Sequence, residues 1–179
     1  MVLRKEIRKM IKKIILVILA LATIYFIGDT NLKGNSVYYA KHSPSSNVRD
    51  LELMIFTENL DILGKKDGFK YKHKIQENKT VQNVEKNVYF SYEFYENMHI
   101  YIYGDEKRKD YYFDENFKLK KVVDFGNNMQ YIDISTVDEN KIKEEIYENF
   151  KPILKELEEN KPFINLQWIF NWVYRDRIK

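Results

Sequence analysis

The chain has 179 residues, 32% of them charged, and a formal net charge of +3 at pH 7. It contains no cysteine, which excludes disulfides, zinc–thiolate sites and thiol nucleophiles. The first 28 residues hold six cations and one anion, so residues 29–179 hold 24 cations and 26 anions, a net charge of −2. Because this larger part lacks excess positive charge, we expect no nucleic-acid partner.

The N-terminal segment, 1–28, combines a cationic flank with the uncharged run IILVILALATIYFI at 14–27. A membrane-spanning helix needs about 20 apolar residues, and Met10 and Ile11 extend the short run by one turn. We therefore expect a single-pass anchor at the cell membrane, with the cationic N-terminus in the cytoplasm and the C-terminal domain outside. The predicted anchor residues are Ile14, Ile15, Leu16, Val17, Ile18, Leu19, Leu21, Ile24, Phe26 and Ile27.

Two other interpretations of this segment remain open. The small residues at 20–22 fit the cleavage site of a signal peptide, although cleavage there leaves TIYFI on the mature end. A buried helix is the third interpretation. A lipoprotein is excluded because the chain has no cysteine.

Residues 29–47 are expected to form a polar tether with a short strand, SVYYAKH, inside it. An outer domain, 48–179, follows. Ser46 or Asn47 can cap a helix whose apolar residues have helical spacing, with an aspartate in its first turn. The same stretch, LELMIFT, also fits a strand, but we favour the helix. The predicted apolar positions of this helix are Val48, Leu51, Met54 and Ile55.

A turn is predicted at GKKDG, 64–68, followed by strictly alternating residues in FKYKHKI, 69–75. An alternation of apolar residues with lysines predicts an antiparallel strand with one solvated face.

The stretches YFSYEFY (89–95) and HIYIYG (99–104) predict two strands joined by a three-residue turn, with Asn97 or a neighbour left-handed. In this register one face is the expected core, and it carries Phe90, Tyr92, Phe94, Ile100 and Ile102. The other face carries Ser91 and residues that, with Tyr112 of the next strand, we call the tyrosine face: Glu93, Tyr95, His99, Tyr101, Tyr103 and Tyr112.

The meander continues through a second three-residue turn, DEN, and two strands around GNN, which gives about six strands. The expected core side of the DEN hairpin carries Tyr111, Phe113, Phe117 and Leu119, and the solvated side carries Tyr112, Lys118 and Lys120.

A long amphipathic helix is predicted to cover the apolar face of this sheet. Thr136 and Glu139 fit a capping box, and Pro152 should kink the helix about one turn back. The predicted apolar stripe is Ile142, Ile146, Phe150, Ile153, Leu154 and Leu157. The expected fold class is α+β, a transmembrane helix followed by an antiparallel meander backed by a long helix.

The C-terminal segment, FINLQWIFNWVYRDRIK, fits either a strand or a helix. Its β-branched and aromatic residues favour the strand.

Residues that carry chemistry are scarce. The chain has no phosphate-binding loop, no nucleophile elbow and no HExxH motif. His42, His73 and His99 lie too far apart for a metal motif, and the acidic cluster at 104–116 lacks calcium-loop spacing. Glu93 near His99 could form an acid–base pair, but a surface pair is the commoner arrangement. We expect no catalytic residue, metal, cofactor or small-molecule substrate.

The tyrosine face has two interpretations. Tyrosine forms strands well, so its abundance need not mark a site. Tyrosine also supplies a large contact area at low entropic cost and is enriched at protein interfaces, which makes this face the predicted partner-binding site.

The lysine-flanked anchor, the outward domain, the tyrosine-rich meander and the closing INLQWIFNWVY together resemble the TipC family of Gram-positive bacteria. The resemblance implies a membrane-anchored, outward-facing immunity protein that neutralises a type VII-secreted toxin directed at the cell-wall precursor lipid II. It also implies a curved sheet backed by helix, with the concave face used for binding. It assigns no role to an individual residue.

Two other function classes remain. The domain could be an accessory or sensor subunit that binds another membrane protein through its anchor. It could also be a cell-envelope enzyme, which would require a pocket with converging polar groups and shifted pKa values.

Overall fold

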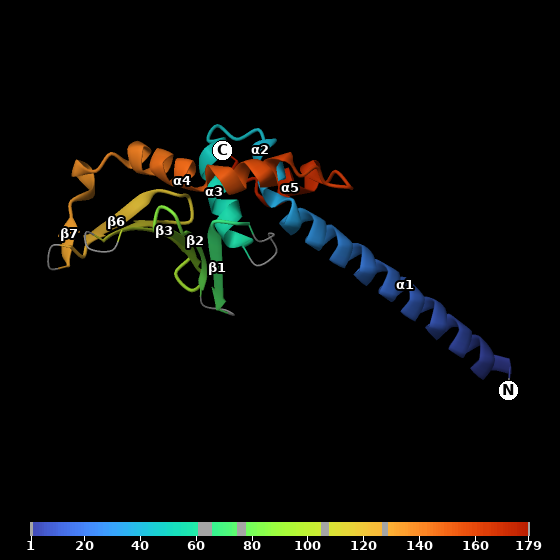
Figure 1. The fold of residues 1–179 in the computed structure, drawn as a ribbon. Coiled ribbons are helices and arrows are strands. Elements are labelled where there is room, and N and C mark those ends of the chain that lie inside the picture. Colours follow the sequence, from blue (N-terminus) through green and yellow to red (C-terminus); the bar gives the residue numbers. More distant parts are fainter. Residues whose placement is uncertain (1, 61–65, 75–77, 105–107, 127–128, 179) are drawn as a thin grey trace.

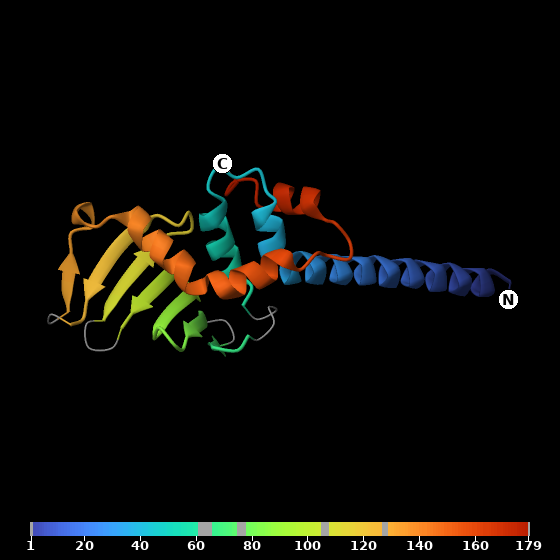
Figure 2. The same cartoon turned by 45° about the horizontal axis from the view of Figure 1, so that its top comes forward.

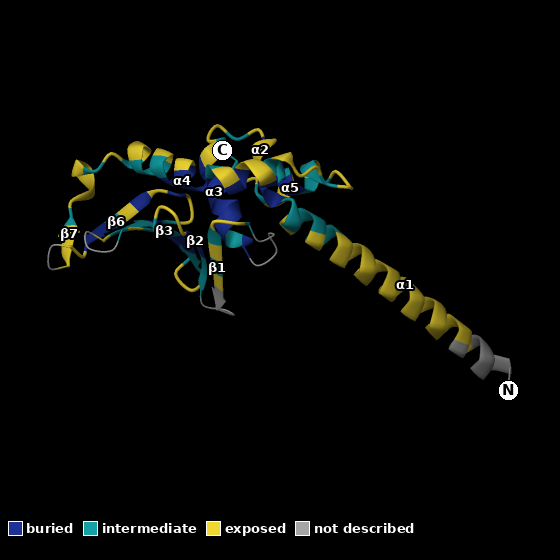
Figure 3. Cartoon of the chain, viewed as in Figure 1, coloured by how far each residue is buried: buried dark blue, intermediate teal, exposed yellow. Residues whose placement is uncertain are grey.

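Helix α1 (Val2–Gly34) projects away from the rest of the chain (Figure 1). The computed structural model describes residues 2–60, 66–74, 78–104, 108–126 and 129–178. Within α1, the stretch Lys9–Gly34 is long and apolar enough to cross a membrane, with a mean hydropathy of 2.3, and none of it is buried. The apolar side chains of the predicted anchor are exposed, as the yellow ribbon of Figure 3 shows. This exposure argues against the buried-helix interpretation.

Helix α2 (Ser36–Lys41) replaces the strand predicted within the tether, so that prediction is wrong. The region is also not a loose polar linker, because Val37, Tyr39 and Ala40 are fully or almost fully buried. The Tyr39 hydroxyl donates to Asn31 Oδ1 at 2.7 Å and accepts from the Leu166 amide at 3.1 Å. Tertiary packing of this kind overrides the strand preference of valine and tyrosine.

Helix α3 (Val48–Glu58) confirms the favoured helix. The Asn47 side chain accepts a hydrogen bond from the Asp50 amide, which caps the helix as predicted, and Asp50 lies in the first turn. The face of α3 that contains Leu51 and Ile55 is buried.

Seven strands form one antiparallel sheet in chain order within the described residues, which confirms the meander. The additional strand is β2, whose polar sequence NKTVQN gave no strand signal. The strands are β1 (Phe69–Lys74), β2 (Asn78–Asn83), β3 (Val88–Glu93), β4 (Met98–Tyr103), β5 (Lys109–Phe113), β6 (Leu119–Asp124) and β7 (Gln130–Ile132). The predicted turn at 64–68 lies partly outside the described residues, as does Ile75 of the first predicted strand.

The β3–β4 register corrects the predicted faces. The turn spans four residues, 94–97, because Glu93 pairs with Met98, and Asn97 is left-handed with φ of 49°. An even turn places Phe90 opposite Tyr101, so both side chains share the core face. The predicted core position Phe94 instead lies in the turn and is 64% exposed.

The DEN hairpin has the predicted core side but not the predicted turn, since five residues, 114–118, separate β5 from β6. Phe113, Phe117 and Leu119 are buried, Tyr111 packs against the core, and the lysines on the other side are exposed. Phe117 is left-handed with φ of 57°, and its ring stacks on Phe113 with centroids 4.6 Å apart.

Helix α4 (Glu139–Glu159) crosses one face of the sheet (Figures 1 and 2). Its predicted stripe from Ile146 to Leu157 is buried, and Phe150 lies 5.8 Å from the Phe90 ring. The predicted capping box is wrong: the 3₁₀ turn η1 (Ile134–Thr136) takes up Thr136, and Asp138 caps α4 by accepting from the Lys141 amide at 3.1 Å. The helix continues through Pro152, and Figure 2 shows that it bends in its middle.

The C-terminal segment contains helix α5 (Gln167–Val173), so the favoured strand is wrong. Phe170 is the buried anchor of this helix and packs against Tyr39 and Tyr174. Figures 1 and 2 place α5 beside the C-terminal end of α1, where the chain enters the domain.

Candidate functional site

The sheet has one covered face and one open face. Helix α4 lies over the first, and Figure 1 shows no described helix over the second. The cross-strand pairs order the open face into two rows. One row is Gln82, Tyr89, Ile102, Asp110, Val123 and Tyr131, and the other is Thr80, Ser91, Ile100, Tyr112 and Lys121. We call these two rows the open face.

Polar contacts hold one end of the open face. Gln82 Nε2 donates to the Tyr89 hydroxyl at 2.8 Å, and the Thr80 and Ser91 hydroxyl oxygens lie 2.9 Å apart. These bonds run between neighbouring strands and fix the side chains against the sheet.

The other end of the open face combines cations with aromatic rings. Lys121 Nζ lies 4.7 Å from the Tyr112 ring centroid and 5.1 Å from that of Tyr131. In the adjoining β4–β5 loop, the Arg108 guanidinium donates two hydrogen bonds, of 2.8 and 2.7 Å, to the Asp110 carboxylate. Cation–π contacts and a bidentate ion pair restrict these side chains, so a partner would meet a partly ordered surface.

The surroundings of Tyr112 on the open face keep its hydroxyl group uncharged. Burial raises the pKa of Tyr112 above its ordinary value of 10.0, and the Asp110 carboxylate raises it further. The hydroxyl therefore remains a hydrogen-bond donor at physiological pH. Glu93, at the edge of this face, has a pKa raised first by burial and then by Glu96.

Two residues of the predicted tyrosine face are covered rather than solvated. His99 and Tyr101 have no exposed surface and lie on the core side of β4. The Tyr101 hydroxyl donates to Glu145 Oε1 at 3.0 Å and accepts from Asn149 Nδ2 at 2.7 Å, which ties β4 to α4. Burial raises the pKa of Tyr101, and Glu145 adds to the effect.

The other four predicted residues do not form one surface. Tyr103 is 49% exposed on the side of α4, and Tyr95 lies exposed in the β3–β4 turn. Glu93 and Tyr112 belong to the opposite, open side of the sheet. The predicted site is therefore divided between two faces because β4 is inverted relative to the expected register.

Glu93 and His99 form neither the favoured surface pair nor the acid–base pair considered beside it, since Tyr92 and not Glu93 is opposite His99. His99 instead contacts Thr57 Oγ1 at 2.9 Å through Nδ1, and its Nε2 lies 3.7 Å from Glu58 Oε1. Arg177 also binds Glu58.

This buried cluster has the composition of an acid–base site but not its accessibility. Burial lowers the pKa of His99 to about 3, with a further contribution from Arg177, so the imidazole is neutral. Its side chain has no solvent-exposed surface through which a substrate could approach. We interpret the cluster as an internal connection between α3, β4 and the C-terminus.

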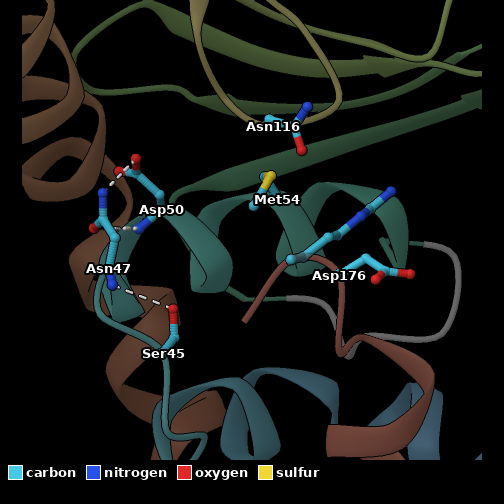
Figure 4. A pocket seen from close by; sticks show the side chains of 7 residues that line it. Ser45, Asn47, Asp50, Met54, Asn116 and Asp176 are labelled. Carbon is cyan, nitrogen blue, oxygen red and sulfur yellow. Dashed lines mark hydrogen bonds between the residues drawn. The ribbon is translucent and has the colours of Figure 1, made fainter. Parts of the chain in front are cut away.

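A pocket of about 360 Å³ lies beside this cluster, between the start of α3 and the C-terminus (Figure 4). Two of its polar residues are bonded to each other, since Asn47 Nδ2 donates to Asp50 at 2.6 Å, and Lys143 outside the lining donates to the same carboxylate at 2.7 Å. Among the described residues no group of histidines, cysteines or carboxylates could hold a metal ion. The pocket offers no nucleophile activated by a base.

Sequence reasoning missed Tyr89, Arg108, Lys121 and Tyr131 as surface candidates. Tyr89 and Tyr131 alternate with core residues in their strands, so the correct register would have assigned them to the open face. No sequence signal marks the pairing of Arg108 with Asp110 as structural rather than solvated.

Comparison of the chain with models of protein families, with curated proteins and with solved structures finds no match.

Proposed function

We propose that this chain is a membrane-anchored binding protein whose domain lies outside the cell and uses the open face of its sheet to hold a secreted protein. The observation that supports the proposal is the open face itself, an ordered aromatic and cationic surface beneath a sheet whose other side is filled by α4. Binding of a protein requires no catalytic residue.

The anchor supports an outward position for the domain. Six cations precede the apolar part of α1, and a cationic flank is retained in the cytoplasm. A domain held at the outer surface meets secreted proteins before they reach the membrane.

The resemblance to the TipC family makes a secreted antibacterial toxin the occupant that we propose. Blocking a toxin needs only a surface that competes with the toxin's own target. Tyrosine and arginine side chains suit this task because they form many of the strongest contacts in protein interfaces.

The experiment measures binding of the purified secreted protein encoded beside the gene of this chain. The full-length chain is placed in lipid nanodiscs, and binding is compared with that of the double variant Tyr112→Ala, Tyr131→Ala. We expect the double variant to bind at least about tenfold more weakly, equivalent to about 1.4 kcal/mol. Thermal unfolding of both proteins checks that the fold persists.

Tyr103→Ala is the matched control, since it removes the same side chain from the opposite side of the sheet. It should bind as the unmodified chain does. Equal losses in the control and the double variant would reject the open face as the site. If the unmodified chain binds no such protein, the toxin proposal fails.

An accessory subunit is the second candidate function. The feature that favours it is exposed apolar surface beside α1, which includes Trp168 and Trp172 of α5. Such a subunit would co-purify with another membrane protein even after its open face is altered.

A further inference from the structure

Helix α5 and the loop before it expose large apolar side chains next to the anchor. Phe163 is completely exposed, and Trp168 and Trp172 are 72% and 65% exposed. The two tryptophans lie four residues apart, on the side of α5 that faces away from its buried residue Phe170. Packing inside the domain therefore does not account for them.

The loop reaches the level of α1 at which the apolar run ends. A pocket is lined by Phe26 and Ile27 of α1 together with Phe163 and Ile164. Figure 2 shows this loop running alongside α1 before the chain turns back into α5. Phe163 is thus placed at the outer end of the predicted span.

Helix α5 lies slightly further from the span. An apolar groove of about 660 Å³ separates it from α1 and is lined by residues between Ile24 and Leu32 on one side and by Ile169 and Val173 on the other. From Ile27 to Leu32 the helix rises about 7.5 Å, at about 1.5 Å per residue. The headgroup layer outside the hydrocarbon core is about 5–8 Å thick, so α5 lies at the level of the headgroups.

We propose that α5 and the 161–166 loop form a second membrane contact, in which Trp168, Trp172 and Phe163 insert into the bilayer interface and a lipid acyl chain occupies the groove. The occupant is lipid because the groove is continuous with the membrane-exposed surface of α1 and its lining is almost entirely apolar. Tryptophan prefers this interface, where an apolar ring and a polar N–H are both accommodated. Arg175, 5.8 Å from the Trp172 ring, supplies a cation at headgroup level.

A two-point contact fixes the orientation of the domain. With α1 alone, the domain could turn about the helix, whereas α5 would hold one side of it against the bilayer. This inference rests on α1 spanning the membrane and is independent of the partner that the open face binds.

The test uses intrinsic fluorescence, because Trp168 and Trp172 are the two tryptophans of the chain. The full-length protein is placed in nanodiscs of phosphatidylcholine and phosphatidylglycerol, with or without bromine on the acyl chains near the headgroup. We expect brominated lipid to quench the emission and aqueous acrylamide to quench it weakly. The single-tryptophan variants Trp168→Phe and Trp172→Phe should each retain the effect.

A control variant reports on the anchor. It carries Trp168→Phe, Trp172→Phe and Leu21→Trp, and its emission should be quenched by lipid brominated deeper in the acyl chain. If it is not, α1 does not span the bilayer and the inference fails. Emission open to acrylamide and unaffected by brominated lipid would place α5 in water. Emission protected from both would indicate a protein contact, such as a second copy of this chain, and would also reject the lipid contact.

Discussion

Phe90 and Phe94 lie four residues apart but have opposite environments. Phe90 is completely buried between Phe117 and Phe150, whereas Phe94 is 64% exposed in the β3–β4 turn. We predict that Phe90→Ala lowers the free energy of unfolding by about 3–5 kcal/mol, because it leaves a cavity in the core. Phe94→Ala should change it by less than about 0.5 kcal/mol.

Denaturant unfolding of the full-length chain in detergent micelles, followed by circular dichroism, measures both values. Each variant serves as the control for the other, since both remove the same side-chain atoms from positions only four residues apart. Comparable losses in the two variants would show that the β3–β4 register is wrong.

The carboxyl group of Glu52 is enclosed where α2, α3 and α4 meet. Its side chain has no exposed surface, Lys41 Nζ lies 3.5 Å away, and the same lysine is 3.4 Å from Glu158. The pKa of Glu52 is raised from 4.5 to about 7, because burial and the neighbouring Glu158 carboxylate together outweigh the opposing effects of Lys41 and Arg49. Between pH 4.5 and about 7, the folded state therefore holds a proton on Glu52 that the unfolded state releases.

The raised pKa predicts that Glu52 contributes most to stability below pH 4.5 and that this contribution is lost as the pH rises through about 7. Glu52→Gln should then stabilise the protein at pH 8, by up to about 3 kcal/mol, and have little effect near pH 4.5. Unfolding measured across this pH range checks the difference, with exposed Glu159→Gln as the control. A Glu52→Gln effect that is the same at both pH values would contradict the shifted pKa.

At the scale of the elements, Asp138 decides where α4 begins. Its carboxylate accepts from the Lys141 amide at 3.1 Å, while Thr136 belongs to the preceding 3₁₀ turn. Asp138→Ala should lower the free energy of unfolding by about 1 kcal/mol, through loss of the N-cap. Thr136→Ala should cost less in the same denaturant titration, and the reverse order would restore the capping box that the sequence suggested.

Periodicity was sufficient to predict most elements but not their faces. The stripe on α4 and the core side of the DEN hairpin follow from spacing, because their apolar positions are buried or, at Ile142 and Tyr111, partly buried against the core. The β3–β4 hairpin differs because, in each of its two strands, apolar or aromatic residues occur on both faces of the sheet. Turn length alone sets which set is covered, and one residue more in the turn moved Tyr101 from the predicted surface to the core.

Two further elements depended on contacts distant in sequence. Helices α2 and α5 are short and rich in residues that favour strands, but Tyr39 joins them through its hydrogen bond with Leu166 and its contact with Phe170. Of the six predicted site residues, Glu93 and Tyr112 lie on the open side of the sheet, and their role in binding stays a prediction. Tyr89 and Tyr131 required the register.

The whole molecule has three parts, which are the helix α1, the covered face of the sheet and the open face of the sheet. Helix α1 extends away from the domain, α4 covers one face of the sheet, and no described helix covers the other face (Figure 1). The domain carries a net charge of −2 and presents Lys121 between two tyrosines on its open face. This arrangement fits the proposed role, in which the domain holds another protein at the membrane.

The most direct measurement of the proposed role is protection of living cells. Sensitive cells that produce the unmodified chain, the Tyr112→Ala, Tyr131→Ala double variant or the Tyr103→Ala control at equal membrane levels are exposed to the secreted toxin encoded by the neighbouring gene. We predict survival with the unmodified chain and with Tyr103→Ala, and death with the double variant. Full protection by the double variant together with loss of protection by Tyr103→Ala would place the site on the side of α4 and contradict the role of the open face.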